Sequence, residues 1–217
     1  MIKGLIFDAD GTLIDSMGYW MSLPSKFLER KGKKSCTSLD ELEKRIFSMT
    51  LEQGAELLKK EAGLCDSAEE IKAELVSMIE EYYKKDIPLK AGAKDFLETM
   101  HAKNIPMAVA TSGSGELVEA ALERLGCLHY FTRILSCGQL GTDKSRPDIY
   151  EALALGFNAA PEEIVVFEDT LVPVQTAAKA GFRVIAISDE ASRKDEAEIR
   201  KYAHLFAEDF NSVKIEL

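Results

Sequence analysis

The chain has 217 residues, more than the roughly 100–200 of a typical domain, so we expect one large domain or one domain with an insertion. Hydrophobic residues make up 46% of the sequence, which is enough for a substantial core. The formal net charge of −10 argues against a surface that binds nucleic acid or an anionic membrane, because both polyanions would be repelled.

The four cysteines show no pattern of a metal site or a disulfide framework. They form no Cys-x-x-Cys pair and have no His at zinc-ligand spacing, so we interpret them as reduced thiols. The N-terminal apolar stretch is too short for the core of a signal peptide, and no run approaches the roughly 20 apolar residues of a membrane span. We therefore expect a soluble protein of the cytoplasm.

The first element in chain order is a strand that ends in two carboxylates, Asp8 and Asp10. The unbroken apolar run 5–7 is typical of a strand covered on both faces, and Gly11 permits a tight turn just beyond it. Ligands bind at the carboxyl ends of such strands, and two neighbouring carboxylates repel each other unless a cation or a shared proton neutralises them. The pattern favours a divalent metal here, and a plain acidic turn is the alternative.

Residues 16–86 contain no convincing strand pattern and are interpreted as consecutive helices. Apolar residues at helical spacing begin near Met17, and Pro24 is expected to kink or split this helix. Two later segments match the capping box, Thr50 with Gln53 and Ser67 with Glu70. The helix that begins after Ser67 is expected to present one apolar face, made of Ile71, Leu75, Met78, Ile79 and Tyr82. We predict a separate helical domain over 16–86.

From residue 87 onward, helix and strand patterns alternate. The expected strands cover residues 107–110, 133–136, 164–167, 183–187 and 205–207. This alternation predicts an α/β fold with a doubly wound parallel sheet. The core domain should therefore comprise residues 1–15 and 87–217, with the helical domain inserted between them.

Further polar residues follow the other predicted strands. Thr111 ends one strand, Glu168 and Asp169 end another, and Lys144 lies in a loop before a helix. Singly, these residues could be a helix cap, a turn and a solvated lysine. Together with Asp8 and Asp10 they supply what phosphoryl transfer requires: an oxygen nucleophile, a cation site, a lysine and an acid. Asp8 can attack phosphorus, and Asp10 can protonate the leaving group and later deprotonate water.

Four motifs in this order resemble those of the haloacid dehalogenase-like hydrolases. They are Asp8-Ala9-Asp10-Gly11-Thr12, the strand end at Thr111, Lys144 three residues before Pro147-Asp148, and Phe167-Glu168-Asp169-Thr170. The inserted helices resemble the cap of the branch that contains the β-phosphoglucomutases and small-metabolite phosphatases. The resemblance implies a Rossmann-like core and a mobile helical cap.

The resemblance also implies a set of site residues. Magnesium would be held by the Asp8 carboxylate, the Asp10 backbone carbonyl and Asp169, with Glu168 as a direct or water-mediated helper. The phosphate-binding residues are predicted as Gly11, Thr111, Ser112 and Lys144.

Two departures from the similar mutases favour water as the acceptor of the phosphoryl group. Trp20 stands where those mutases have a His in the cap hinge, and indole cannot relay a proton as imidazole does. The stretch 48–52 lacks the Arg that would hold a second phosphate. Trp20 could line a substrate pocket or could simply pack within the cap.

We therefore predict a magnesium-dependent phosphatase that acts on a small phosphorylated metabolite, with sugar phosphates as candidates. A cap that closes over the site would exclude large substrates. The alternatives are a β-phosphoglucomutase-type phosphohexomutase and a non-catalytic module that binds a metal or another ligand.

Overall fold

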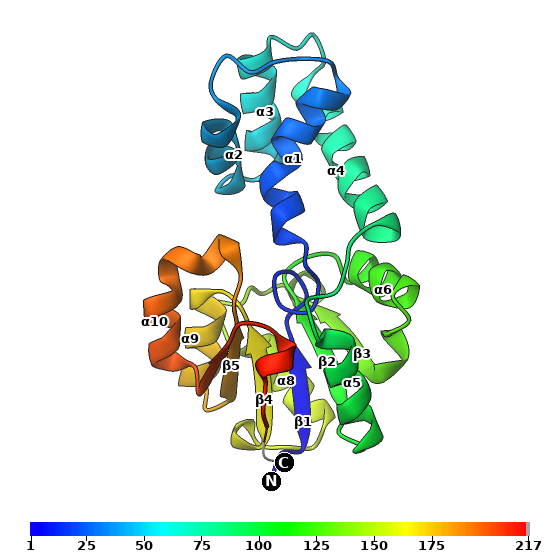
Figure 1. Cartoon of the computed structure of the whole chain (residues 1–217), viewed down its shortest axis with the longest axis vertical. Coiled ribbons are helices and arrows are strands. Elements are labelled where there is room, and N and C mark those ends of the chain that lie inside the picture. The colour runs from blue at the N-terminus through cyan, green and yellow to red at the C-terminus, as the bar shows by residue number, and fades with distance from the viewer. Residues whose placement is uncertain (216–217) are drawn as a thin grey trace. The chain divides into compact units, whose positions relative to one another are not determined.

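A computed structural model describes residues 1–215 of the chain. The fold divides into two compact units. Residues Met1–Ser16 and the chain from Ile87 onward form one, which we call the α/β unit, and residues Met17–Asp86 form the other, which we call the helical unit (Figure 1). The helical unit is thus an insertion that directly follows the loop after the first strand.

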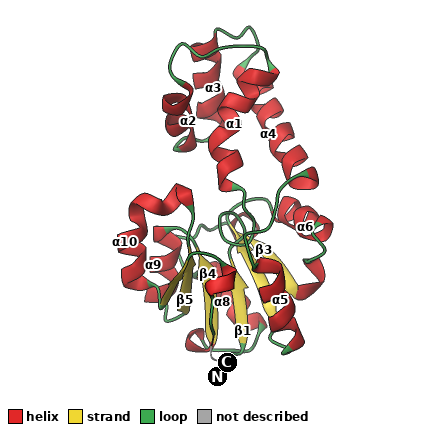
Figure 2. Ribbon diagram, viewed as in Figure 1, coloured by secondary structure: helices red, strands yellow, loops and turns green. Residues whose placement is uncertain are grey.

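The α/β unit contains a six-stranded parallel sheet of order β3-β2-β1-β4-β5-β6. Figure 2 shows strands of this sheet in yellow, with helices in red beside them. The strands are β1 (Gly4–Phe7), β2 (Met107–Thr111), β3 (Phe131–Ser136), β4 (Ile164–Glu168), β5 (Arg183–Ile187) and β6 (Leu205–Ala207). Chain order runs outward in both directions from β1, so the prediction of a doubly wound parallel sheet is confirmed.

Strand β1 lies inside the sheet, between β2 and β4, and all four of its residues are buried. Ile6 pairs with Val166 and Phe7 with Phe167 in the parallel register with β4. Because side chains alternate across a sheet, these two pairs belong to opposite faces. The Phe7 and Phe167 rings stack with centroids 4.5 Å apart. An uninterrupted apolar run suits β1 because both of its faces are covered.

Helices cover both faces of this sheet. They are α5 (Ala93–Ala102), α6 (Gly115–Arg124), α7 (Cys137–Leu140), α8 (Asp148–Gly156), α9 (Leu171–Lys179) and α10 (Glu196–Tyr202), with short 3₁₀ turns between some of them. On the face of Ile6 the core includes Leu153 of α8, Val174 of α9 and Ile199 of α10. On the face of Phe7 the aromatic rings of Phe96 and Phe210 complete the core.

The helical unit consists of four helices. They are α1 (Met17–Arg30), α2 (Leu39–Phe47), α3 (Leu51–Ala62) and α4 (Ala68–Lys85). Both predicted capping boxes are confirmed at the starts of α3 and α4, and Gly63 ends α3 in the left-handed conformation that glycine adopts without strain.

Two details of the helical unit differ from the sequence prediction. Pro24 does not split α1, which continues to Arg30. Pro24 is buried, as are Leu23 and Phe27, and burial of apolar surface can offset the one hydrogen bond that proline cannot donate. On α4 the buried tyrosine is Tyr83 rather than Tyr82. The Tyr82 ring instead stacks on Tyr19, with centroids 3.8 Å apart.

Trp20 takes part in the packing of this unit. Its indole Nε1 donates a hydrogen bond to the Tyr83 hydroxyl over 3.1 Å. The polar edge of the ring therefore has a partner within the helical unit.

Across residues 1–215, the helices are all too short or too polar to cross a membrane.

Candidate active site

The polar residues singled out in the sequence lie at or just after the ends of neighbouring strands of the sheet. Asp8 follows β1, Thr111 ends β2 on one side of it, and Glu168 ends β4 on the other, followed by Asp169. Strand order reverses direction beside β1, and in sheets of this kind ligands bind at the carboxyl ends of the strands next to such a reversal. Parallel pairing thus gathers residues that lie more than a hundred positions apart in the sequence.

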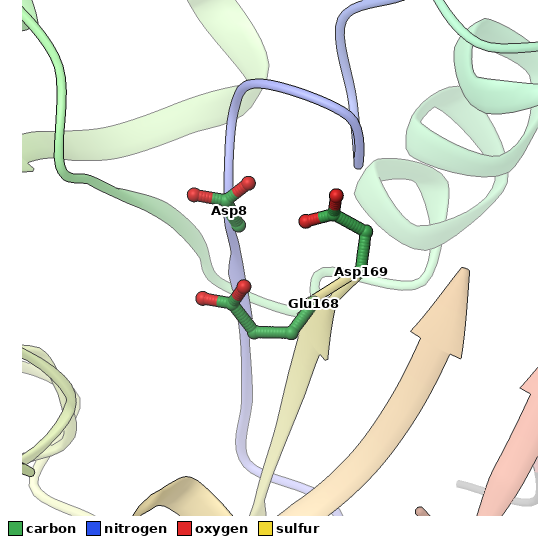
Figure 3. Close-up of side chains that lie close together, drawn as sticks. All are labelled: Asp8, Glu168 and Asp169. Carbon is green, nitrogen blue, oxygen red and sulfur yellow. The ribbon is translucent and has the colours of Figure 1, made fainter. Parts of the chain in front are cut away.

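Asp8, Glu168 and Asp169 form a buried carboxylate cluster. One oxygen from each of the three lies within 4.8 Å of the others, and Figure 3 shows the side chains converging from β1 and from the end of β4. Their exposed fractions are only 7%, 1% and 2%. Three carboxylates that lie this close together and are this little exposed to solvent repel one another unless a cation or bound protons neutralise their charge.

This repulsion appears in the pKa values of the cluster. Burial raises the pKa of Asp169 well above its usual range, and the negative charges of Asp8, Glu168 and Asp189 add to the rise. Burial also raises the pKa of Glu168, to about 7, with Asp8 adding to the rise while Lys144 and the Tyr150 hydroxyl oppose it. Both groups therefore hold protons more tightly than exposed carboxyl groups do.

One buried oxygen of the cluster has no hydrogen-bond partner among the described residues. Asp169 Oδ2 is buried and accepts no hydrogen bond, and it is the one such side-chain atom within residues 1–215. An unpaired buried carboxylate oxygen is costly, and oxygen atoms are the ligands that hard divalent cations prefer. The donor set therefore fits a divalent metal ion.

Lys144 enters the cluster from the loop before α8. Its Nζ donates hydrogen bonds to Asp8 Oδ1 and, over 2.6 Å, to Glu168 Oε1. Only 5% of Lys144 is exposed. Burial alone would lower the pKa of this ammonium group, but the Asp8 and Glu168 carboxylates outweigh burial and raise it. Lys144 thus stays positively charged beside Asp8.

The loop after β1 contacts the cluster through Thr12. Gly11 has a φ of +87°, in the region that favours glycine, and its N–H donates to the Ile14 carbonyl. The N–H group of Gly11, a residue predicted to bind phosphate, is therefore engaged within its own loop. The next residue, Thr12, is fully buried and donates from Oγ1 to Asp169 Oδ1 over 3.2 Å. This bond holds one Asp169 oxygen and leaves Oδ2 as the free one.

Asp10 lies next to the end of β2. Ser16 Oγ, fully buried, donates to Asp10 Oδ1 over 2.7 Å. A side chain added at Gly113 would come within 3.4 Å of both Asp10 Oδ2 and Thr111 Oγ1, so these three residues are close neighbours. Thr111 Oγ1 in turn accepts the Gly113 N–H over 2.9 Å.

Ser112 has a different neighbour. Its side chain hydrogen-bonds the Cys137 thiol, and this contact partly opposes the rise in the Cys137 pKa that burial causes. The structure thus brings Asp8, Glu168, Asp169 and Lys144 into direct proximity, and it places Asp10 beside Thr111. The roles of these residues in catalysis and metal binding remain predictions.

Three further residues contact candidate site residues and were not identified from the sequence. Thr12 holds Asp169, Ser16 holds Asp10, and Tyr150 donates to Glu168 over 2.7 Å. Each acts through a hydroxyl group on a loop or helix, and hydroxyl residues are too common at such places to stand out. Only Thr12, inside the first motif, had a sequence signal that could have identified it.

Comparison with known proteins finds relatives that are named as phosphatases. The chain is 28% identical over 184 residues to the phosphorylated carbohydrates phosphatase of Thermotoga maritima, covering 85% of this chain and 84% of that protein. It is 26% identical over 189 residues to the fructose-1-phosphate phosphatase YqaB of Escherichia coli, covering 85% and 95%.

A solved structure from Thermotoga maritima, described as a candidate beta-phosphoglucomutase, matches with a TM-score of 0.83 at 25% identity over 94% of each chain. The family model described as haloacid dehalogenase-like hydrolase matches residues 5–187, a span that contains the whole carboxylate cluster and Lys144. The chain therefore belongs to the haloacid dehalogenase-like hydrolases.

Proposed function

We propose that the chain is a magnesium-dependent phosphatase that hydrolyses a small phosphorylated metabolite, with sugar phosphates as the first candidates. The observation that supports this most is the Lys144 ammonium group held between Asp8 and Glu168, beside an Asp169 oxygen that lacks a partner. A candidate nucleophile, a positive charge and a candidate cation site would thus lie together near the carboxyl ends of β1 and β4. The sugar-phosphate class follows from the relatives, whose names include a carbohydrate phosphatase and a fructose-1-phosphate phosphatase.

In this proposal Mg²⁺ would be held by the carboxylates of Asp8 and Asp169 and by the Asp10 backbone carbonyl, with Glu168 as helper. When bound, the ion supplies positive charge that offsets the carboxylates and the phosphoryl oxygens. Oxygen ligands and a small cation match each other in charge and hardness.

The protein side chains would perform the reaction in two steps. An Asp8 oxygen attacks phosphorus and forms an aspartyl-phosphate, while Asp10 gives its proton to the departing alkoxide oxygen. Asp10 then takes a proton from water, which attacks the phosphorus, breaks the Asp8–phosphate bond and releases inorganic phosphate. Lys144 offsets the negative charge that develops on the phosphoryl oxygens, and Thr111 orients them.

The helical unit would act as the cap that selects the substrate. It directly follows the loop that carries Asp10, and the Ser16 that binds Asp10 is the last residue before α1. Substrate selection by an inserted helical unit would also account for relatives that share the α/β fold and act on different phosphate esters.

The test is a panel of phosphorylated sugars, polyols and nucleotides, assayed for released phosphate with and without magnesium. We expect turnover of at least one small sugar phosphate, loss of turnover when the cation is chelated, and no turnover by Asp8→Asn. Asp95→Asn, the same change on the exposed surface of α5, should retain full activity. Near-normal rates in Asp8→Asn would exclude the aspartyl-phosphate route.

A phosphohexomutase is the second candidate, because a candidate beta-phosphoglucomutase shares the fold with a TM-score of 0.83. Conversion of β-glucose 1-phosphate to the 6-phosphate with little free phosphate would favour it. A protein that gains thermal stability from magnesium but turns over no ester would instead be a binding module, since any ligand of the native state stabilises it.

A further inference from the structure

Tyr150 is a fully buried tyrosine whose hydroxyl group reaches the candidate site. It lies in the first turn of α8, with 0% of its surface exposed, and is among the largest wholly buried side chains of residues 1–215. Its ring packs in the core on the Ile6 face of the sheet, 6.0 Å from the Phe182 ring. Packing alone would be served by phenylalanine, which carries no polar atom into the core.

The hydroxyl of Tyr150 donates a hydrogen bond to Glu168. It donates to Oε1 over 2.7 Å, the same oxygen that accepts Lys144 Nζ over 2.6 Å. Burial, and then the nearby Glu168 carboxylate, raise the pKa of Tyr150 well above its usual range, so the hydroxyl keeps its proton and remains a donor.

Two donors on one oxygen restrain Glu168 more than a single contact would. A glutamate side chain has several rotatable bonds, and an ammonium group is a point charge that fixes distance rather than direction. Tyr150 comes from a rigid, buried helix position and therefore fixes the direction. The restraint reaches the proposed nucleophile, because Lys144 also donates to Asp8.

We propose that Tyr150 is a positioning residue, whose hydroxyl group fixes the Glu168 carboxylate and thereby holds Lys144 where charge develops on the transferred phosphoryl group. This inference rests on the proposed function, and it adds a residue of α8 to the groups that shape the site. Tyr150 itself would touch neither the substrate nor the metal ion.

The decisive variant is Tyr150→Phe, which removes the hydroxyl and keeps the ring. With saturating magnesium and p-nitrophenyl phosphate, we expect kcat to fall about tenfold, the loss expected for a hydrogen bond to a charged group, while KM changes less than twofold. Orthovanadate, which mimics the five-coordinate phosphorus of the transition state, should bind about tenfold more weakly, as measured by the vanadate-dependent rise in Tm. Orthophosphate binding should change less than twofold.

Phe182→Leu is the matched control, because it disturbs the same packing without touching Glu168. It should lower Tm and leave kcat and vanadate binding within twofold of the unmodified protein. If Tyr150→Phe keeps kcat and vanadate binding within twofold, or if both variants lose them equally, Tyr150 only packs the core and the inference is wrong.

The vanadate measurement separates this inference from the proposed function. An unmodified protein that binds vanadate but hydrolyses no ester would refute the phosphatase assignment. The ratio of vanadate affinities between Tyr150→Phe and the unmodified protein would still decide the role of Tyr150. An unmodified protein without vanadate binding would refute both.

Discussion

The carboxyl groups of Asp169 and Glu168 should link the proposed metal binding to pH. Both have raised pKa values in the folded protein, and that of Glu168 is about 7 against an ordinary value of 4.5. At pH values between 4.5 and about 7, Glu168 holds a proton in the folded state that it has already lost in the unfolded state. The stability of the cation-free protein should therefore fall as the pH rises through this window.

A divalent cation should reverse this loss, because it binds the deprotonated carboxylates. We predict that magnesium raises Tm more at about pH 8 than at about pH 5. The measurement is thermal unfolding with magnesium chloride or sodium chloride at matched ionic strength. Asp169→Asn should lose most of the magnesium-dependent rise, and an equal rise at both pH values would contradict the assignment of the metal to this cluster.

Ser16 should matter for catalysis although it touches no substrate in the proposed mechanism. Its buried hydroxyl donates to Asp10 over 2.7 Å, and losing a hydrogen bond to a charged group costs roughly 1.5–3 kcal/mol. We expect Ser16→Ala to lower kcat by about tenfold or more with any substrate that is turned over.

Ser16→Thr keeps the hydroxyl and should retain most of this activity. Ser212→Ala, at a surface 3₁₀ turn where the hydroxyl donates to Asp209 O, is the matched control and should be unaffected. A kcat of Ser16→Ala within twofold of the unmodified protein would show that Asp10 needs no such support.

Site residues could be predicted from the sequence where a charged side chain stands at a position that is otherwise apolar or at the end of a buried strand. Asp8 and Asp169 stand out because carboxylates directly follow buried strands. Thr12, Ser16 and Tyr150 do not stand out, because their importance depends on where a hydroxyl points in three dimensions. Tyr150 in particular fits the apolar pattern of α8 and would pass as an ordinary core residue.

At the scale of elements, the fit of β1 against the end of α8 depends on Gly4. A Cβ added there would lie 2.5 Å from a ring carbon of Phe157 and 3.0 Å from a side-chain carbon of Ile164. Such an overlap forces neighbouring groups to shift, which typically costs about 1–3 kcal/mol. The strand that carries Asp8 is thus placed by the absence of a side chain.

We predict that Gly4→Ala lowers the free energy of unfolding by about 1–3 kcal/mol in urea denaturation. The double variant Gly4→Ala/Phe157→Ala should lose less free energy of unfolding than the sum of the losses of the two single variants, because the clash disappears when the Phe157 ring is removed. Strict additivity would show that Phe157 is not what Gly4 makes room for.

Elements were predictable where the signal is local. The capping boxes at Thr50 and Ser67 were found because each involves residues three positions apart. The unsplit α1 was not predicted, since the burial of Pro24 is a property of the folded protein that the local sequence pattern does not show. The order of the strands in the sheet could not be predicted either, because the alternation of helices and strands along the chain does not specify that β1 lies between β2 and β4.

At the scale of the whole molecule, the net charge of −10 should influence which phosphate esters the protein accepts. Long-range repulsion lowers the association rate of polyanions, by about 10-fold or more in strongly charged systems. We predict that kcat/KM for an oligonucleotide with a 5′-phosphate is at least about tenfold below that for a small sugar phosphate.

Added salt should narrow this difference, because the screening length falls from about 10 Å at 0.1 M to about 3 Å at 1 M. The small ester, measured over the same salt series, is the control for general salt effects. Equal kcat/KM values for the two substrates at low salt would mean that the overall charge does not influence substrate choice.

The place of β1 has a consequence for the order in which the protein assembles. The strand that carries Asp8 pairs with β2 and β4, whose first residues are Met107 and Ile164. A chain made from its N-terminal end exposes β1 long before either neighbour exists, whereas the contacts between α3 and α4 of the helical unit are local and form quickly. Asp8, the proposed nucleophile, is synthesised before β2 and β4, and its site is complete only after β4 has been added.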